Sequence, residues 1–252
     1  MKKVRIAAVA GVATLSLAVP AVAQTPPLEV TVTGTVKAAK GKAATKKKPK
    51  NATVRFSFTA NAESKKTAST LVLRYPETIK LSGKGFPTCD IQTVADDPAG
   101  CPKGSQIGQG SASASLNGVT DLDFETRVYV NGANEVALYL RETGELGFQF
   151  AFPGVISKAS KPYGQQVRIS IPPAVQFPAQ GLEAYITGVD ATIGGKFTKG
   201  KGKRKKTYFA ASLTGCPADK THDFGLDITY VPNTAGGGGT ATDFSDEAPC
   251  KK

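Results

Sequence analysis

Leu28-Glu-Val-Thr-Val-Thr-Gly-Thr-Val-Lys37 sets the pattern that decides the fold class. Its apolar side chains fall on one face of an extended chain, with polar side chains between them: Leu28, Val30, Val32 and Val36. Successive side chains of a β-strand point to opposite faces, so this two-residue period indicates a strand with one buried face. We therefore expect residues 28–37 to form a half-buried strand.

The same alternation recurs through most of the chain. It is found in residues 53–59, 71–75, 128–130, 136–140, 146–152, 167–171, 182–186, 189–193, 209–213 and 226–230. Beyond residue 23 no stretch shows helical apolar spacing over three turns, and one short helical turn is expected between Asp90 and Ala95. About a dozen short strands separated by turn residues predict an all-β fold, an antiparallel β-sandwich with long basic loops. Because no linker interrupts the pattern, a single all-β domain over residues 24–252 is favoured over two domains.

Residues 1–23 have the features of a secretory signal peptide. Lys2, Lys3 and Arg5 precede a mostly apolar run, and Ala21-Val-Ala23 provides a small-residue cleavage site. The apolar run is too short for a membrane span, which needs about 20 residues, and no later stretch is apolar enough. We therefore expect a secreted, extracellular protein, associated with the cell wall, that has no transmembrane segment after cleavage.

The cysteines form two widely separated groups. Gly83-Lys-Gly-Phe-Pro-Thr-Cys89 is followed, after eleven residues, by Cys101-Pro-Lys-Gly-Ser-Gln-Ile-Gly-Gln-Gly110, whereas Cys216 and Cys250 lie much later. An even number of cysteines in an exported chain indicates disulfides, here two, and four cysteines allow three pairings. Pairing within each group would close loops of about 13 and about 35 residues. We favour this pairing because each bridge would then constrain one of the two least regular segments of the chain.

These motifs resemble a group of uncharacterised secreted all-β proteins of actinobacteria. The resemblance rests on Phe86-Pro-Thr-Cys89 and the glycine-rich segment after Cys101, and on three later motifs: Cys216-Pro, Ile228-Thr-Tyr-Val and Pro249-Cys250. It covers the chain from about Leu71 onward. It implies export, a β-rich fold and cysteines paired locally within each motif. It implies no activity, and the long lysine-rich loops are peculiar to this chain.

Residues suited to catalysis are sparse. The single histidine, His222, lies in a polar run at residues 218–223, which predicts a surface histidine rather than a catalytic base. The spacing of Cys89 and Cys101 does not match a zinc site, and oxidised cysteines cannot bind a metal. We therefore expect no catalytic residue, no metal site and no cofactor.

A short acidic segment supports the alternative, an extracellular hydrolase acting on glycans. Asp121, Asp123 and Glu125 fall on one side of an extended segment, as calcium ligands or a glycosidase carboxylate pair would. An acidic turn before a strand explains them more simply, and the chain has no tryptophan on which a sugar would stack. Three tyrosines that might replace it are expected instead to fill a second buried sheet face: Tyr129, Tyr139 and Tyr185.

Two lysine-rich loops, at residues 38–51 and 196–206, are the strongest surface signal. Without the three basic residues of the leader, the formal net charge of +12 falls to +9. The candidate polyanion-binding residues are Lys46, Lys47, Lys48, Lys50, Lys199, Lys201, Lys203, Arg204, Lys205 and Lys206. Outside the cell they would meet an anionic cell-wall polymer, lipid headgroups or an acidic glycan. Alternatively, the lysines only keep hairpin tips soluble and block edge pairing.

No aromatic residue alternates with the lysines of either loop, so specific recognition of nucleic acid is not expected. Taken together, these features predict an exported, non-catalytic binding or structural module of the cell envelope.

Overall fold

The structure is a computed structural model that describes residues 29–40, 43–234, 238–239 and 242–250. The predicted signal peptide at residues 1–23 lies outside these residues. The strands of the described part are β1 (Val30–Ala38), β2 (Lys50–Ala60), β3 (Ala68–Pro76), β4 (Ile79–Leu81), β5 (Gln106–Leu116), β6 (Thr120–Gly132), β7 (Glu135–Glu142), β8 (Gln149–Lys158), β9 (Tyr163–Ser170), β10 (Ala184–Ile193), β11 (Lys196–Lys199), β12 (Lys206–Phe209), β13 (Ala211–Leu213), β14 (Thr221–Tyr230) and β15 (Thr242–Pro249). Two short helices accompany them, α1 (Ile91–Asp96) and α2 (Pro173–Gln176).

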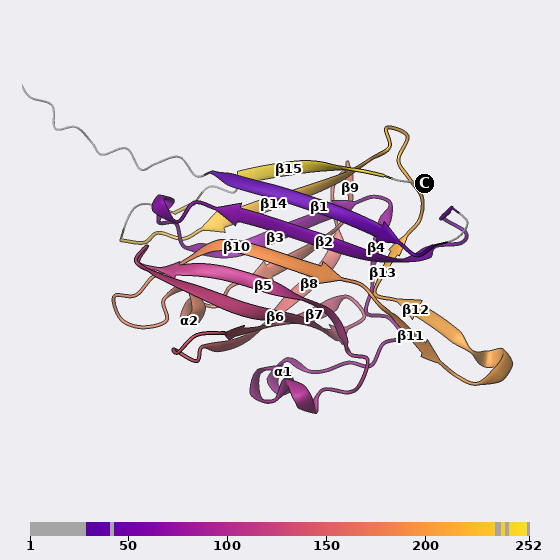
Figure 1. The fold of residues 1–252 in the computed structure, drawn as a ribbon, viewed down its shortest axis with the longest axis horizontal. Helices are drawn as coiled ribbons and strands as arrows, with labels where there is room; N and C mark the ends of the chain where they lie inside the picture. Colours follow the sequence, from indigo (N-terminus) through magenta and orange to yellow (C-terminus); the bar gives the residue numbers. More distant parts are fainter. Residues whose placement is uncertain (1–28, 41–42, 235–237, 240–241, 251–252) are drawn as a thin grey trace, which may run out of the picture.

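Thirteen of the strands form one antiparallel sheet in the order β15-β14-β3-β9-β8-β7-β6-β5-β10-β2-β13-β4, with β1 paired to β2. The sheet curls over, so that β15, β14, β3, β2 and β1 face a second layer formed by β10, β5, β6, β7 and β8 (Figure 1). β1 thereby comes to lie alongside β15, where the Gly34 amide donates a 2.9 Å hydrogen bond to Asp246 Oδ2. The predicted all-β, sandwich-like fold is confirmed.

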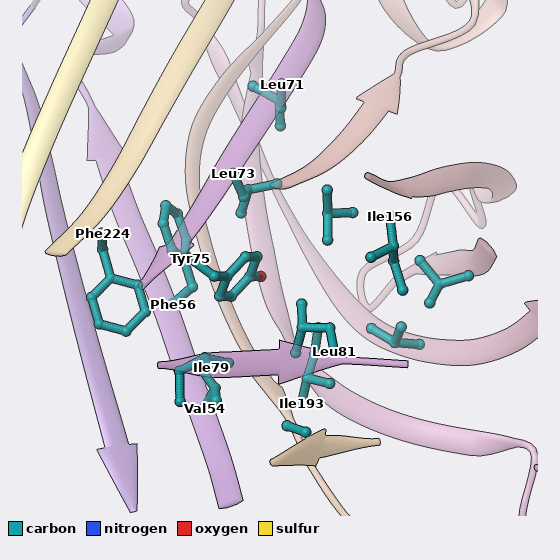
Figure 2. Close-up of a cluster of buried hydrophobic side chains, with 14 of the residues drawn as sticks. Val54, Phe56, Leu71, Leu73, Tyr75, Ile79, Leu81, Ile156, Ile193 and Phe224 are labelled. Atoms are coloured by element: carbon teal, nitrogen blue, oxygen red, sulfur yellow. The ribbon is translucent and has the colours of Figure 1, made fainter. Parts of the chain in front are cut away.

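The main core lies between the layers, where the alternating apolar residues meet. Phe56, Tyr75 and Phe224 form an aromatic group at its centre, with ring centroids 6.1–6.2 Å apart (Figure 2). A Cβ atom added at Gly34 would lie 2.1 Å from the Phe224 ring, so β1 can pass the ring only with a glycine at this position. One face of each surrounding strand is therefore held by direct packing.

The first cysteine loop covers part of the outer surface. Cys89 and Cys101 form a disulfide with a Cα–Cα distance of 5.3 Å, and the loop between them carries α1, whose first turn is capped by Asp90. Val94 of α1 packs over Tyr129 and Tyr139 on the outer face of β6 and β7. The predicted helical turn is thus confirmed, and so is the burial of the three tyrosines, since Tyr185 is also buried.

The second disulfide joins Cys216 to Cys250, with a Cα–Cα distance of 5.8 Å. It links the connection before β14 to the end of β15, two strands that already pair along their length. Both cysteine pairs are therefore the local ones favoured from the sequence.

Because neighbouring strands run in opposite directions, their connections gather at two ends of the molecule. One end carries the β1–β2 and β11–β12 connections (Figure 1, right), and Lys161 of the β8–β9 connection borders the same hollow as Lys46. We call it the lysine end. The opposite end carries the β2–β3, β5–β6 and β7–β8 connections and α2, and we call it the α2 end (Figure 1, left).

Candidate functional site

The first lysine-rich loop is a small hairpin rather than a structureless loop. Thr45 and Lys48 form an antiparallel bridge, and the Lys48 amide donates to Thr45 O at 3.0 Å and to Thr45 Oγ1 at 3.1 Å. Lys46 and Lys47 therefore occupy the two-residue tip, where both side chains are exposed. Lys50 differs from them, because it begins β2 and is half-buried.

The second lysine-rich loop is the β11–β12 hairpin, which extends away from the large sheet (Figure 1). Its base is anchored on the segment just before Cys89, where the rings of Phe197 and Phe86 lie 5.9 Å apart. Tyr208 packs so closely on Gly85 that an added Cβ would lie 2.4 Å from the ring, and Gly85 also has a φ of +85°. These contacts fix the direction in which a two-stranded hairpin, weak by itself, projects.

The bases of the two lysine hairpins adjoin each other. At the start of β2, Lys50 is paired with Leu213 of β13, and β13 follows directly after β12. On the other side of β2, Val54 is paired with Ile193, three residues before β11 begins. Strand pairing thus brings two segments about 150 residues apart in the sequence to one end of the fold.

Most of the candidate cations at this end are exposed, and among the described residues they have no ionic partner. Ion pairs among the described residues all contain an arginine: Arg55–Asp190, Arg74–Asp227, Arg127–Glu125 and Arg141–Glu125. The candidate residues from Lys199 to Lys206 are exposed, and so are Lys46, Lys47 and Lys48. Within the described part of the chain, none of these cations has a carboxylate within 4.0 Å, so they remain available for an external anion.

One pair in the second hairpin is unfavourable in the isolated protein. Lys199 of β11 lies directly opposite Lys206 of β12. Like charges in directly opposed positions destabilise a strand pair, and a bound anion would relieve the repulsion. Lys206 is partly compensated, because its Nζ lies 5.3 Å from the centre of the Tyr208 ring.

Sequence reasoning missed further lysines at this end. Lys158, the last residue of β8, and Lys161, in the β8–β9 connection, border a hollow that also contains Lys80. Only the strand order brings these scattered residues together, so the sequence contains no run of basic residues that would identify this part of the surface. A neighbouring hollow of about 610 Å³ combines Lys46 with three acids, which partly balance the charge on that side: Glu77, Asp219 and Asp223.

The three acids of the alternative function lie on the outer face of β6, as the alternation predicts. Glu125 accepts hydrogen bonds from Arg127 Nε at 2.8 Å and from the Arg141 guanidinium at 2.9 Å, and these bonds hold the pKa of its carboxyl below the ordinary value. A carboxyl that is ionised at neutral pH does not serve as a general acid. Among the described residues, no group of histidines, cysteines and acids is arranged to hold a metal ion.

His222 corrects the prediction of a surface histidine. Its side chain is only 2% exposed, near the start of β14 on the core-facing side, and its Nδ1 lies 3.1 Å from Thr78 Oγ1. Burial lowers the pKa of the imidazole below 6.5 and outweighs the opposing effect of Asp223 and Asp219. Successive side chains of β14 point to opposite faces, so the polar neighbours of His222 point outward while His222 points inward. These polar neighbours are the reason why the sequence wrongly predicted a surface position.

This burial predicts a specific loss of stability in mild acid. The unfolded chain takes up a proton on His222 near pH 6.5, whereas the folded chain resists it, so the free energy of unfolding should fall as the pH drops from about 7 to about 5. Because His222 is the only histidine, His222→Asn should flatten this part of the profile. Urea unfolding at a series of pH values measures it, and equal slopes for the two proteins would contradict the assignment.

Comparison with protein-family models, curated proteins and solved structures found no match to this chain. No helix in the described residues is long and apolar enough to cross a membrane. The function is therefore inferred from the geometry of the lysine end itself.

Proposed function

We propose that the protein is an exported, non-catalytic module of the cell envelope that binds anionic wall polymer through the lysine end. The observation that carries the proposal is the joining of the two lysine hairpins at their bases, through the pairing of β2 with β13 and β10. The leader-like residues 1–23, the two disulfides and the resemblance to secreted proteins support export.

The chemistry of the lysine end suits a repetitive polyanion better than a single defined ligand. A lysine ammonium is a strongly hydrated point charge on a flexible stem, whereas bidentate recognition of phosphate or carboxylate is performed by arginine. Arg204 is the only arginine among the candidate residues. Binding should therefore be driven by the release of counterions, should depend little on polymer sequence and should weaken steeply with salt.

The test is retention of the purified protein on immobilised wall teichoic-type polymer across a salt gradient. Changing Lys46, Lys47, Lys48, Lys203, Arg204, Lys205 and Lys206 together to serine should abolish most of the retention. Each cation near an anionic surface contributes about 1 kcal/mol, so we expect at least a ten-fold loss of affinity at low salt. Far-ultraviolet circular dichroism should be unchanged, because these side chains are exposed.

Matched three-charge variants separate location from net charge. The first variant removes three charges at the lysine end by changing Lys46, Lys47 and Lys48 to serine. The second variant removes three exposed charges elsewhere by changing Lys65, Lys66 and Arg168 to serine. Only the first variant should elute at clearly lower salt. If both elute alike, or if the seven-site variant is retained like the parent, the lysines are solubilising tips and the proposal is wrong. Tighter binding to anionic vesicles than to wall polymer would assign the site to lipid headgroups instead.

A further inference from the structure

A narrow apolar cavity lies between the two layers toward the α2 end. It has a volume of about 80 Å³, and its wall comes from β3, β5, β6, β7, β8, β9, β10 and the α2 segment. The wall is almost entirely apolar and includes Leu122, Phe124, Leu140, Phe150, Ile171 and Val175. Nothing in the proposed binding of polyanions uses this cavity, which lies away from the lysine end.

Small side chains on two adjacent strands create the hollow. On β5 the inward positions opposite large residues of β6 are Ala112 and Ala114, which pair with Phe124 and Leu122. On β10 the wall includes Ala184 and Ala191. Protein interiors are normally packed without such gaps.

The dimensions favour a slender ligand. The wall extends along β6 from Leu122 to Thr126, which corresponds to about 13 Å of strand. A volume of about 80 Å³ spread over this length makes the hollow narrow, and a narrow hollow favours an extended hydrocarbon chain over a ring system.

One polar group in the wall lacks a partner. Thr126 lines the cavity and is only 2% exposed, yet its hydroxyl makes no hydrogen bond in the structure. It shares the inward face of β6 with Phe124 and Val128. A buried hydroxyl without a partner costs free energy, and a ligand oxygen would remove that cost.

The connections bordering the cavity expose apolar side chains to solvent. Val119 is 85% exposed, Leu146 is 54% exposed and Phe177 is 39% exposed. Each lies within three residues of the wall, on the β5–β6, β7–β8 and β9–β10 connections. Among the described residues only one other large apolar side chain, Val155, is this exposed. Three connections next to the wall in the sequence thus carry an exposed apolar side chain each.

We propose that this cavity binds a lipid-like molecule with one unbranched hydrocarbon chain and a neutral oxygen that accepts a hydrogen bond from the Thr126 hydroxyl. The chain fills the narrow space beside Ala112 and Ala114 and extends toward Val119, Leu146 and Phe177. A charged head group is disfavoured inside, because the wall holds no ionised side chain to pair with it. The inference is independent of the lysine end.

The test is a methyl-resolved NMR titration of the purified protein with octan-1-ol, and with octanoate as the charged counterpart. Octan-1-ol should give saturable shifts at the methyl groups of Ala112, Leu122 and Leu140. The exposed methyl groups of Val155 report non-specific contact and should not move. Octanoate should bind at least ten-fold more weakly at neutral pH, and equal affinity of the two probes would overturn the proposed ligand chemistry.

Two variants and a matched control test the location. Ala112→Leu fills the hollow and should weaken octan-1-ol binding at least ten-fold, whereas Ser111→Leu adds the same side chain on the outer face of β5 and should not. Thr126→Val keeps the shape but removes the hydroxyl, so we expect about five-fold weaker binding, the value of one neutral hydrogen bond. Thermal unfolding checks that each variant is folded. Unchanged binding in Thr126→Val, or absence of saturable binding in the parent, would overturn the proposal.

Discussion

Phe224→Ala should lower the free energy of unfolding by about 3–5 kcal/mol, the usual cost of removing a fully buried phenylalanine ring. Phe224 is 0% exposed and lies at the centre of the aromatic group, 6.2 Å from both Phe56 and Tyr75. Removing its ring leaves a cavity where β14, β2 and β3 meet and where β1 crosses at Gly34. Urea denaturation at neutral pH measures the loss.

Phe177→Ala is the matched control for this prediction. The same ring is removed, but Phe177 is 39% exposed at the α2 end, so the expected loss is about 1 kcal/mol or less. Comparable losses in the two variants would mean that the aromatic group is not the centre of the core.

Removing either disulfide should have an effect of similar size. In the chain-entropy model, loss of Cys89–Cys101 costs about 3 kcal/mol and loss of Cys216–Cys250 costs about 4 kcal/mol, because the second closes the longer loop. Alanine replacements of each pair, compared by urea denaturation, should show this order.

Peptide mapping under non-reducing conditions tests the same pairs directly. It should recover Cys89 linked to Cys101 and Cys216 linked to Cys250. A peptide that joins an early cysteine to a late one would contradict the structure, and metal released on reduction would contradict a purely covalent role.

The strands that the sequence predicts are those in which large apolar residues alternate with polar ones. β5 was not predicted, because most of its inward positions hold glycine or alanine and Ser-Ala-Ser-Ala has little hydrophobic contrast. β15 was not predicted, because it is acidic and polar and forms a strand through its pairing with β14. Both failures have one cause: partner strands rather than local sequence decide whether such segments become strands.

The candidate site also has features that the sequence predicts and features that depend on strand pairing. The exposure of Lys46, Lys47 and Lys48 follows from composition, so the sequence predicts it. The joining of their hairpin to β11–β12 depends on β2 pairing with both β10 and β13, which no local pattern encodes. The cavity beside Ala112 is equally hidden, because a gap is a property of several strands together. The alternating Ala112, Ala114 and Leu116 was the one available signal for its wall.

The contact between β1 and β15 has a consequence for how the chain folds during synthesis. These are the first and last of the described strands, and Gly34 and Asp246 are 212 positions apart. A chain synthesised from its N-terminus cannot form the contacts between β1 and β15 until β15 has emerged, and contacts between such distant residues form slowly. In that interval β1, which pairs only with β2, can contact β15 of a second copy instead. Exchange of these strands between copies is therefore the misassembly to which this topology is most exposed.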